Sequence, residues 1–177
     1  MNAKRSIQSR ELEATRLAVA WEIVSRSEIN KADPLYAARI VRQVLAIFRD
    51  PEGQVGALPV SPRESQGSAG EAFRISYNFS GGPTSIPLRV FVHFVGERGN
   101  VVFQDDHESP RPTVFWSERT TYSRDVAIPQ GTPPGVYRIR LGLYDAYGSH
   151  ERLDLDPQQG TFAADYRACE VGTLRIE

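Results

Sequence analysis

The segment 133–145 constrains the fold of this 177-residue chain more than any other part of the sequence. A Pro-Pro-Gly turn leads into a stretch in which alternate residues are apolar or aromatic: Tyr137, Ile139, Leu141 and Leu143. Alternation with a period of two after a turn signal is typical of a half-buried antiparallel strand. The Gly-x-Tyr at its start has the pattern of a tyrosine corner, which marks the penultimate strand of immunoglobulin-like sandwiches.

The same alternation recurs from residue 72 to the end of the sequence, with Gly and Pro turns between the alternating stretches. We expect a hairpin turn at 96–100. The expected strands lie at 72–79, 86–95, 101–104, 120–128, 136–145 and 171–176, with a weaker strand at 57–60 and a short strand or irregular edge at 113–116. Many short strands separated by turns predict an all-β, immunoglobulin-like antiparallel sandwich over residues 71–177.

The N-terminal part of the sequence has a different pattern, because its first glycine is Gly53. Residues 10–25 and 34–49 carry apolar side chains at helical spacing. Asp33 can cap the second helix, and Pro34 fits its first position, where a missing N–H costs nothing. We therefore expect an N-terminal α-helical hairpin in residues 1–53, joined by a linker at 54–70 to the sandwich.

Two helices of this length cannot enclose a core between them, so their apolar face needs another surface. That surface is either the sandwich or a second subunit. The polar composition of residues 61–70 favours a flexible linker, and hence docking to a protein partner or self-association through residues 10–49. The predicted docking face consists of Leu17, Trp21, Val24, Ile40, Val44 and Phe48.

Charge and composition argue against several classes of partner. The chain has 21 Lys and Arg against 22 Asp and Glu, for a net charge of −1, which gives no electrostatic case for nucleic acid. The sequence has no apolar run long enough for membrane insertion or a signal peptide. Its single cysteine, Cys169, cannot form an intramolecular disulfide, which favours a reducing compartment. We expect a cytoplasmic protein.

The densest cluster of metal-ligand residue types is Asp105-Asp106-His107-Glu108. Adjacent residues at a strand end point to opposite sides, so at most two of these side chains can reach one ion. A solvated loop is the alternative interpretation. The sequence has no nucleophile elbow and no phosphate-binding glycine loop. We therefore expect no cofactor and no enzymatic activity, with a metal-dependent enzyme at this cluster as the alternative.

Aromatic side chains are more numerous than a core of this size needs, and sugars bind by stacking on aromatic rings. The predicted binding residues are Phe115, Trp116, Tyr122, Tyr144 and Tyr147. The competing interpretation is that Trp116 and Tyr122 fill the gap between the sheets. The sequence thus predicts a protein-binding or assembly module, with a glycan-binding module as the alternative.

Several runs of the sequence resemble a recurring bacterial β-sandwich domain. They are residues 89–94, 99–107, 128–129, 134–137 and 142–145, together with Trp116. Such domains occur as accessory domains of membrane glycosyltransferases. A looser similarity is to the polysaccharide-binding C-terminal sandwich of O-antigen ABC transporters. The resemblance covers residues 71–177 and implies an immunoglobulin-like fold with polysaccharide as a partner, although the sequence contains neither a transmembrane region nor an ATPase.

Overall fold

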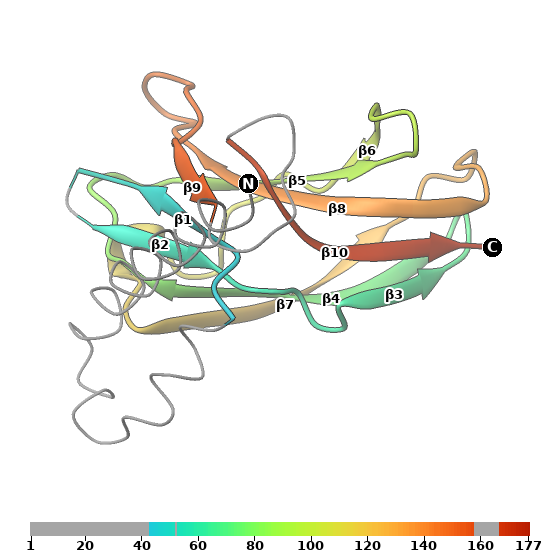
Figure 1. The fold of residues 1–177 in the computed structure, drawn as a ribbon, viewed down its shortest axis with the longest axis horizontal. Helices are drawn as coiled ribbons and strands as arrows, with labels where there is room; N and C mark the ends of the chain where they lie inside the picture. The colour runs from blue at the N-terminus through green and yellow to red at the C-terminus, as the bar shows by residue number, and fades with distance from the viewer. Residues whose placement is uncertain (1–42, 52, 158–166) are drawn as a thin grey trace, which may run out of the picture.

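The computed structural model describes residues 43–51, 53–157 and 167–177. These residues form two five-stranded sheets, with the strand orders β7-β4-β2-β1-β9 and β3-β10-β8-β5-β6 (Figure 1). The strands are β1 (Ala46–Arg49), β2 (Gln54–Ala57), β3 (Glu64–Gly67), β4 (Ala72–Gly81), β5 (Arg89–Val95), β6 (Val101–Gln104), β7 (Arg119–Ala127), β8 (Gly135–Tyr144), β9 (Leu155–Pro157) and β10 (Cys169–Ile176).

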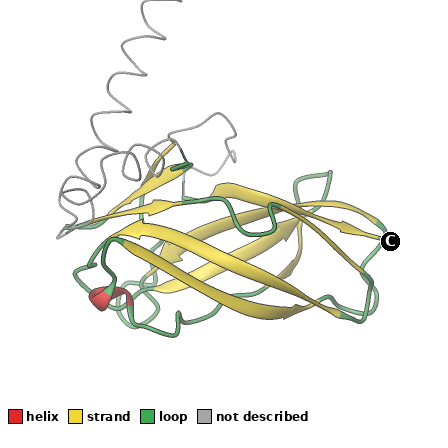
Figure 2. Cartoon of the chain, turned by 90° about the horizontal axis from the view of Figure 1, so that it is seen from below, coloured by secondary structure: helices red, strands yellow, loops and turns green. Residues whose placement is uncertain are grey.

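The two sheets lie face to face with the apolar core between them, in a β-sandwich-like fold (Figure 2). Alternate residues of each long strand point into this core, as the period of two predicted. On β4 the inward side chains are Phe73, Ile75, Tyr77 and Phe79, each at most 6% exposed. The expected strands at 72–79, 101–104, 120–128, 136–145 and 171–176 are confirmed with small shifts at their ends.

The start of β8 has the hydrogen bond that characterises a tyrosine corner. The Tyr137 hydroxyl donates to the carbonyl oxygen of Pro133 at 2.5 Å, while its ring is buried in the core. The bond joins the turn before β8 to the strand itself. The tyrosine-corner prediction is therefore confirmed.

One pair of strands departs from the predicted antiparallel arrangement. β3 runs parallel to β10, with Glu64 opposite Thr173 and Gly67 opposite Ile176. The described strands otherwise pair antiparallel. The parallel pair places the last described strand between β3 and β8.

The C-terminal end of the predicted second helix is wrong, because Ala46–Arg49 forms strand β1. Val44 and Phe48, assigned to the docking face, are 1% and 0% exposed, and Phe48 lies in the core between the sheets. A short apolar run is compatible with a strand buried on both faces as well as with a helix, and here the neighbouring strands β2 and β9 decide. The predicted docking residues Leu17, Trp21, Val24 and Ile40 lie outside the described residues.

The segment predicted as a linker, 54–70, contains β2 and β3. Val55, Ala57 and Val60 are buried in the core, so the sandwich begins well before residue 71. The polar composition of 61–70 has another cause, because β3 is an edge strand and most of its side chains are at least partly exposed. The expected short strand at 113–116 is instead a 3-10 turn, Thr113–Phe115. Within the described ranges no helix has the length and apolar character needed to cross a membrane.

Candidate recognition surface at one end of the sandwich

Three long loops meet at one end of the sandwich, at the left of Figure 1 and away from the C-terminus. They connect β4 to β5 (82–88), β6 to β7 (105–118) and β8 to β9 (145–154). Strand register brings them together, because Arg89 faces Tyr144 and Arg119 faces Ser80. We call these three loops the loop end.

Buried hydrogen bonds hold the first two loops in place. The hydroxyls of Thr84 and Thr113 are 2.7 Å apart, and Thr113 Oγ1 accepts the backbone N–H of Leu88 at 2.9 Å. From the turn between β1 and β2, the Asp50 carboxylate accepts the backbone N–H and the hydroxyl of Ser85, each at 2.8 Å. These bonds fix the β4–β5 loop to the β6–β7 loop and to the turn between β1 and β2.

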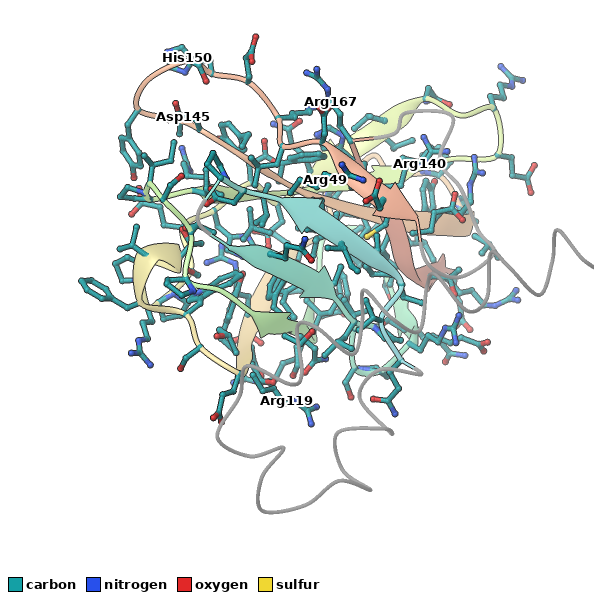
Figure 3. All side chains as sticks on the ribbon, turned by 60° about the vertical axis from the view of Figure 1, so that its left-hand side comes forward. Arg49, Arg119, Arg140, Asp145, His150 and Arg167 are labelled. Carbon is teal, nitrogen blue, oxygen red and sulfur yellow. The ribbon has the colours of Figure 1, made fainter. Side chains whose placement is uncertain are left out.

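The loop after β8 is organised around the Asp145 carboxylate (Figure 3). It accepts the backbone N–H groups of Tyr147, Gly148 and Ser149 at 3.0, 2.9 and 2.7 Å. These hydrogen bonds, that of Ser149 above all, lower the pKa of Asp145. A Cβ at Gly148 would lie 2.6 Å from a carboxylate oxygen of Asp145, so a larger residue there would displace this carboxylate. The turn thereby sets the position of Tyr147.

A shallow groove of about 300 Å³ lies between these loops. Its lining consists of Pro87, Leu88, Glu108, Ser109, Pro112 and Tyr147. The Tyr147 hydroxyl donates to Glu108 Oε1 at 2.5 Å, a bond that raises the pKa of Tyr147 and spans the groove. The groove therefore has an apolar wall of proline and leucine and a polar wall with one carboxylate.

Each of the three loops carries one exposed large apolar side chain. Ile86, Phe115 and Tyr147 are 41%, 59% and 64% exposed, and all three belong to the loop end. Val101 and Val136, which are also exposed, lie toward the opposite end of the strands. The loop end is thus an apolar surface on loops that are already fixed in position.

The predicted aromatic binding residues do not form one surface. Trp116 is 1% exposed, its ring centroid lies 4.5 Å from that of Phe79, and its Nε1 donates to the carbonyl of Arg111. Tyr122 is half-buried and packs against the core, in agreement with the alternative that it fills the gap between the sheets. Tyr144 is half-buried on the outer face of β8 beside Phe91. Of the five predicted residues, Phe115 and Tyr147 are the two that are mostly exposed, and both belong to the loop end.

The cluster at 105–108 divides between two sides, as strand alternation predicted. Asp105 and His107 point into the sandwich, and Glu108 lines the groove. Asp106 accepts the backbone N–H of Val92 at 3.1 Å. No group of three or more potential His, Cys, Asp or Glu ligands exists among the residues that the structure describes.

Asp105 and His107 instead belong to a polar network between the two sheets, together with Tyr77, Tyr122 and Arg124. Asp105 accepts hydrogen bonds from the Tyr77 hydroxyl at 3.0 Å and from both Nε and Nη2 of Arg124, at 3.1 and 3.0 Å. His107 Nε2 lies 2.9 Å from the Tyr122 hydroxyl. Each polar group of the network has a partner within it, so these residues join the two sheets.

Burial raises the pKa of Asp105, but hydrogen bonds from His107 and Arg124 and the charges of the two groups outweigh it and lower the pKa to about 2. Burial also raises the pKa of Tyr77 and of Tyr122 well above the ordinary tyrosine value. The Asp105 carboxylate is therefore ionised, pairs with the charged Arg124 and orients the Tyr77 hydroxyl.

Sequence reasoning assigned Ile86 to a strand and missed it as a surface residue. The signal against a strand was Pro87, which cannot donate to a sheet ladder. The chain matches no protein-family model, and no curated protein matches it.

Proposed function

We propose that this chain is a binding module of immunoglobulin-like topology that recognises a partner protein with its loop end. Three features support the immunoglobulin-like assignment: two packed sheets, the tyrosine corner before β8, and connections that cross between the sheets after β4, β6 and β7. In such sandwiches the loops at one end are a common recognition surface.

The observation that carries the proposal is the exposure of Ile86, Phe115 and Tyr147 on three braced loops. A large apolar side chain held in place loses little conformational entropy on binding, and such residues are typical anchors of protein interfaces. Tyr147 adds a rigid ring whose hydroxyl is already bonded to Glu108. These properties favour a protein surface with an apolar centre as the ligand.

The glycan alternative has less support. It depended on a strip of five aromatic side chains, but Trp116 is buried, and Tyr122 and Tyr144 are half-buried. Ile86 and the wall formed by Pro87 and Leu88 are aliphatic and offer no ring for a sugar to stack on. Self-association through residues 10–49 stays a prediction. Val44 and Phe48 no longer belong to the predicted docking face, because both side chains are buried.

The test begins by locating the surface in the cell. A photo-cross-linking amino acid is placed at Phe115 or at Tyr147, with Val101 and Val136 as matched exposed positions toward the other end. Cross-links to a defined protein should form from the loop-end positions and be absent from the control positions. The cross-linked protein is then identified and purified.

Binding of this purified protein is measured by calorimetry. The Phe115→Ala variant should weaken affinity by about tenfold or more, the effect expected for a central interface anchor. The Val136→Ala variant should bind like the unchanged chain, and both variants should unfold at the unchanged temperature. Equal affinity for Phe115→Ala, or binding of oligosaccharide in place of protein, would rule out this function.

A further inference from the structure

The edge of the sheet formed by β7 offers a second, independent interaction surface. β7 is nine residues long and is the outer strand of its sheet, at the lower side of Figure 1. Within the described part of the chain it pairs with β4 alone. A long edge strand is a template for pairing with another strand.

Strand register tells which backbone groups of β7 face outward. The backbone N–H of Ile128 donates to Glu71, and that of Gly81 donates to the carbonyl of Glu118, at the two ends of the β4–β7 ladder. In an antiparallel ladder hydrogen-bonded pairs alternate with pairs that are not bonded. The even-numbered residues of β7 therefore bond to β4, and the odd-numbered residues direct their N–H and C=O groups away from it.

The side chains of the same odd-numbered residues lie on the outer face of the sheet. They alternate with the inward residues along the strand and are all exposed: Arg119, Thr121, Ser123, Asp125 and Ala127. Figure 3 places Arg119 at the lower rim of the molecule, at the start of β7. This face thus carries one positive charge near one end of the strand and one negative charge near the other.

We propose that β7 pairs antiparallel with β7 of a second copy of this chain, about a two-fold axis at Tyr122. Residues at equal distances from the axis then face each other, so Arg119 of each copy lies opposite Asp125 of the other, and Thr121 lies opposite Ser123. All of these are odd-numbered residues with outward backbone groups, so each such pair forms ladder hydrogen bonds. The two sheets become one continuous sheet.

The charges select this register over its neighbours. An axis at Ser123 would place Arg119 opposite Ala127, and an axis at Thr121 would place Arg119 opposite Ser123, so neither brings opposite charges together. Asp125 bonds Arg74 of its own chain through both oxygens at 3.1 Å, and Arg119 also has an interaction within its own chain. A carboxylate accepts more than one donor and a guanidinium has five N–H donors, so both side chains can make the additional pair. Opposite charges placed directly across a ladder stabilise it, and like charges destabilise it.

The experiment measures the mass of the full-length chain by sedimentation over a range of concentrations. The mass of the unchanged chain should rise with concentration to that of a dimer. Arg119→Asp and Asp125→Arg should each weaken the dimer by about tenfold or more, because each reversal places like charges opposite each other at two symmetric positions. The double variant, which carries both Arg119→Asp and Asp125→Arg, should dimerise like the unchanged chain because its facing charges are again opposite.

An equimolar mixture of the two single variants provides the decisive control, because in it every pair of facing charges is again opposite. It should form a dimer that contains one chain of each kind, as native mass spectrometry can show. A second control compares Ser123→Pro, which removes an outward N–H, with Ser123→Ala, which keeps it. Only the proline variant should be monomeric, with circular dichroism showing that both fold.

Two results would overturn the proposal. One is a chain that stays monomeric at every concentration reached. The other is a dimer that neither the charge reversals nor Ser123→Pro weaken, since such a dimer would use another surface. Both results leave the loop end untouched, so this proposal and the proposed function fail separately.

Discussion

At the scale of single residues, Asp105 is held by partners from more than one strand. It lies between the two sheets and accepts bonds from Tyr77 on β4 and from Arg124 on β7. Its own position, just after β6, belongs to the opposite sheet. One carboxylate therefore ties the edge of one sheet to the edge of the other.

We expect the contribution of Asp105 to stability to depend on pH. Its pKa in the folded state is about 2, below the unfolded value near 4, so the folded state favours the ionised carboxylate. The contribution is fully present above about pH 4 and is lost as pH falls toward 2. Urea unfolding of the unchanged chain and of Asp105→Asn, at a series of pH values, should show a difference in unfolding free energy that shrinks by roughly 1–2 kcal/mol over this range. A difference that is constant with pH would contradict this role.

The sequence predicted part of this environment and missed part of it. Alternation along a strand end separated Asp105 and His107 from Asp106 and Glu108, which is how the structure places them. Their partners Tyr77 and Arg124 lie on strands distant in the sequence, and no local pattern indicates such a pairing. The burial of Trp116 has the same origin, because Phe79 on β4 covers its ring.

At the scale of elements, β1 is the clearest case of tertiary structure overriding a local pattern. The apolar residues before Arg49 recur at a spacing that fits a helix, yet Ala46–Arg49 pairs with β2 on one side and β9 on the other. Each neighbour supplies ladder hydrogen bonds that the segment alone cannot make. Strands with strict alternation, such as β4 and β8, were predictable because a period of two has no helical interpretation.

Phe48 tests this assignment of β1. Its side chain is fully buried in the core, so Phe48→Ala should lower the unfolding free energy by about 3–5 kcal/mol. A residue on the exposed face of a docking helix would change stability far less. The measurement is denaturant unfolding, and Phe115→Ala, at an exposed aromatic residue of the loop end, serves as the control with little expected change. A loss below about 1 kcal/mol for Phe48→Ala would contradict the core position.

At the scale of the whole molecule, the sandwich depends on strands before residue 71. β1 and β2 fill the centre of one sheet, between β4 and β9, and β3 forms an edge of the other. Their side chains Phe48, Val55 and Ala57 are part of the single core. The boundary that composition suggested, at the end of a polar stretch, therefore divides one cooperative unit.

A fragment of residues 71–177 should for this reason fail to fold. It lacks three of the ten strands that the structure describes and leaves β4 without its ladder partner β2. We expect poorly dispersed amide resonances and no cooperative thermal transition, whereas the full chain should show both dispersion and a sharp transition. A fragment with the stability of the full chain would show that β1 to β3 are dispensable.

The position of β10 has a consequence for synthesis of the protein. This strand fills the space between β8 and β3, which is distant from it in the sequence. While the nascent chain emerges from the ribosome, β8 has an open edge and β3 lacks its ladder partner until β10 has left the exit tunnel. The sheet therefore closes only after β10 has been translated, and until then the open edge of β8 is available to chaperones and to other nascent chains.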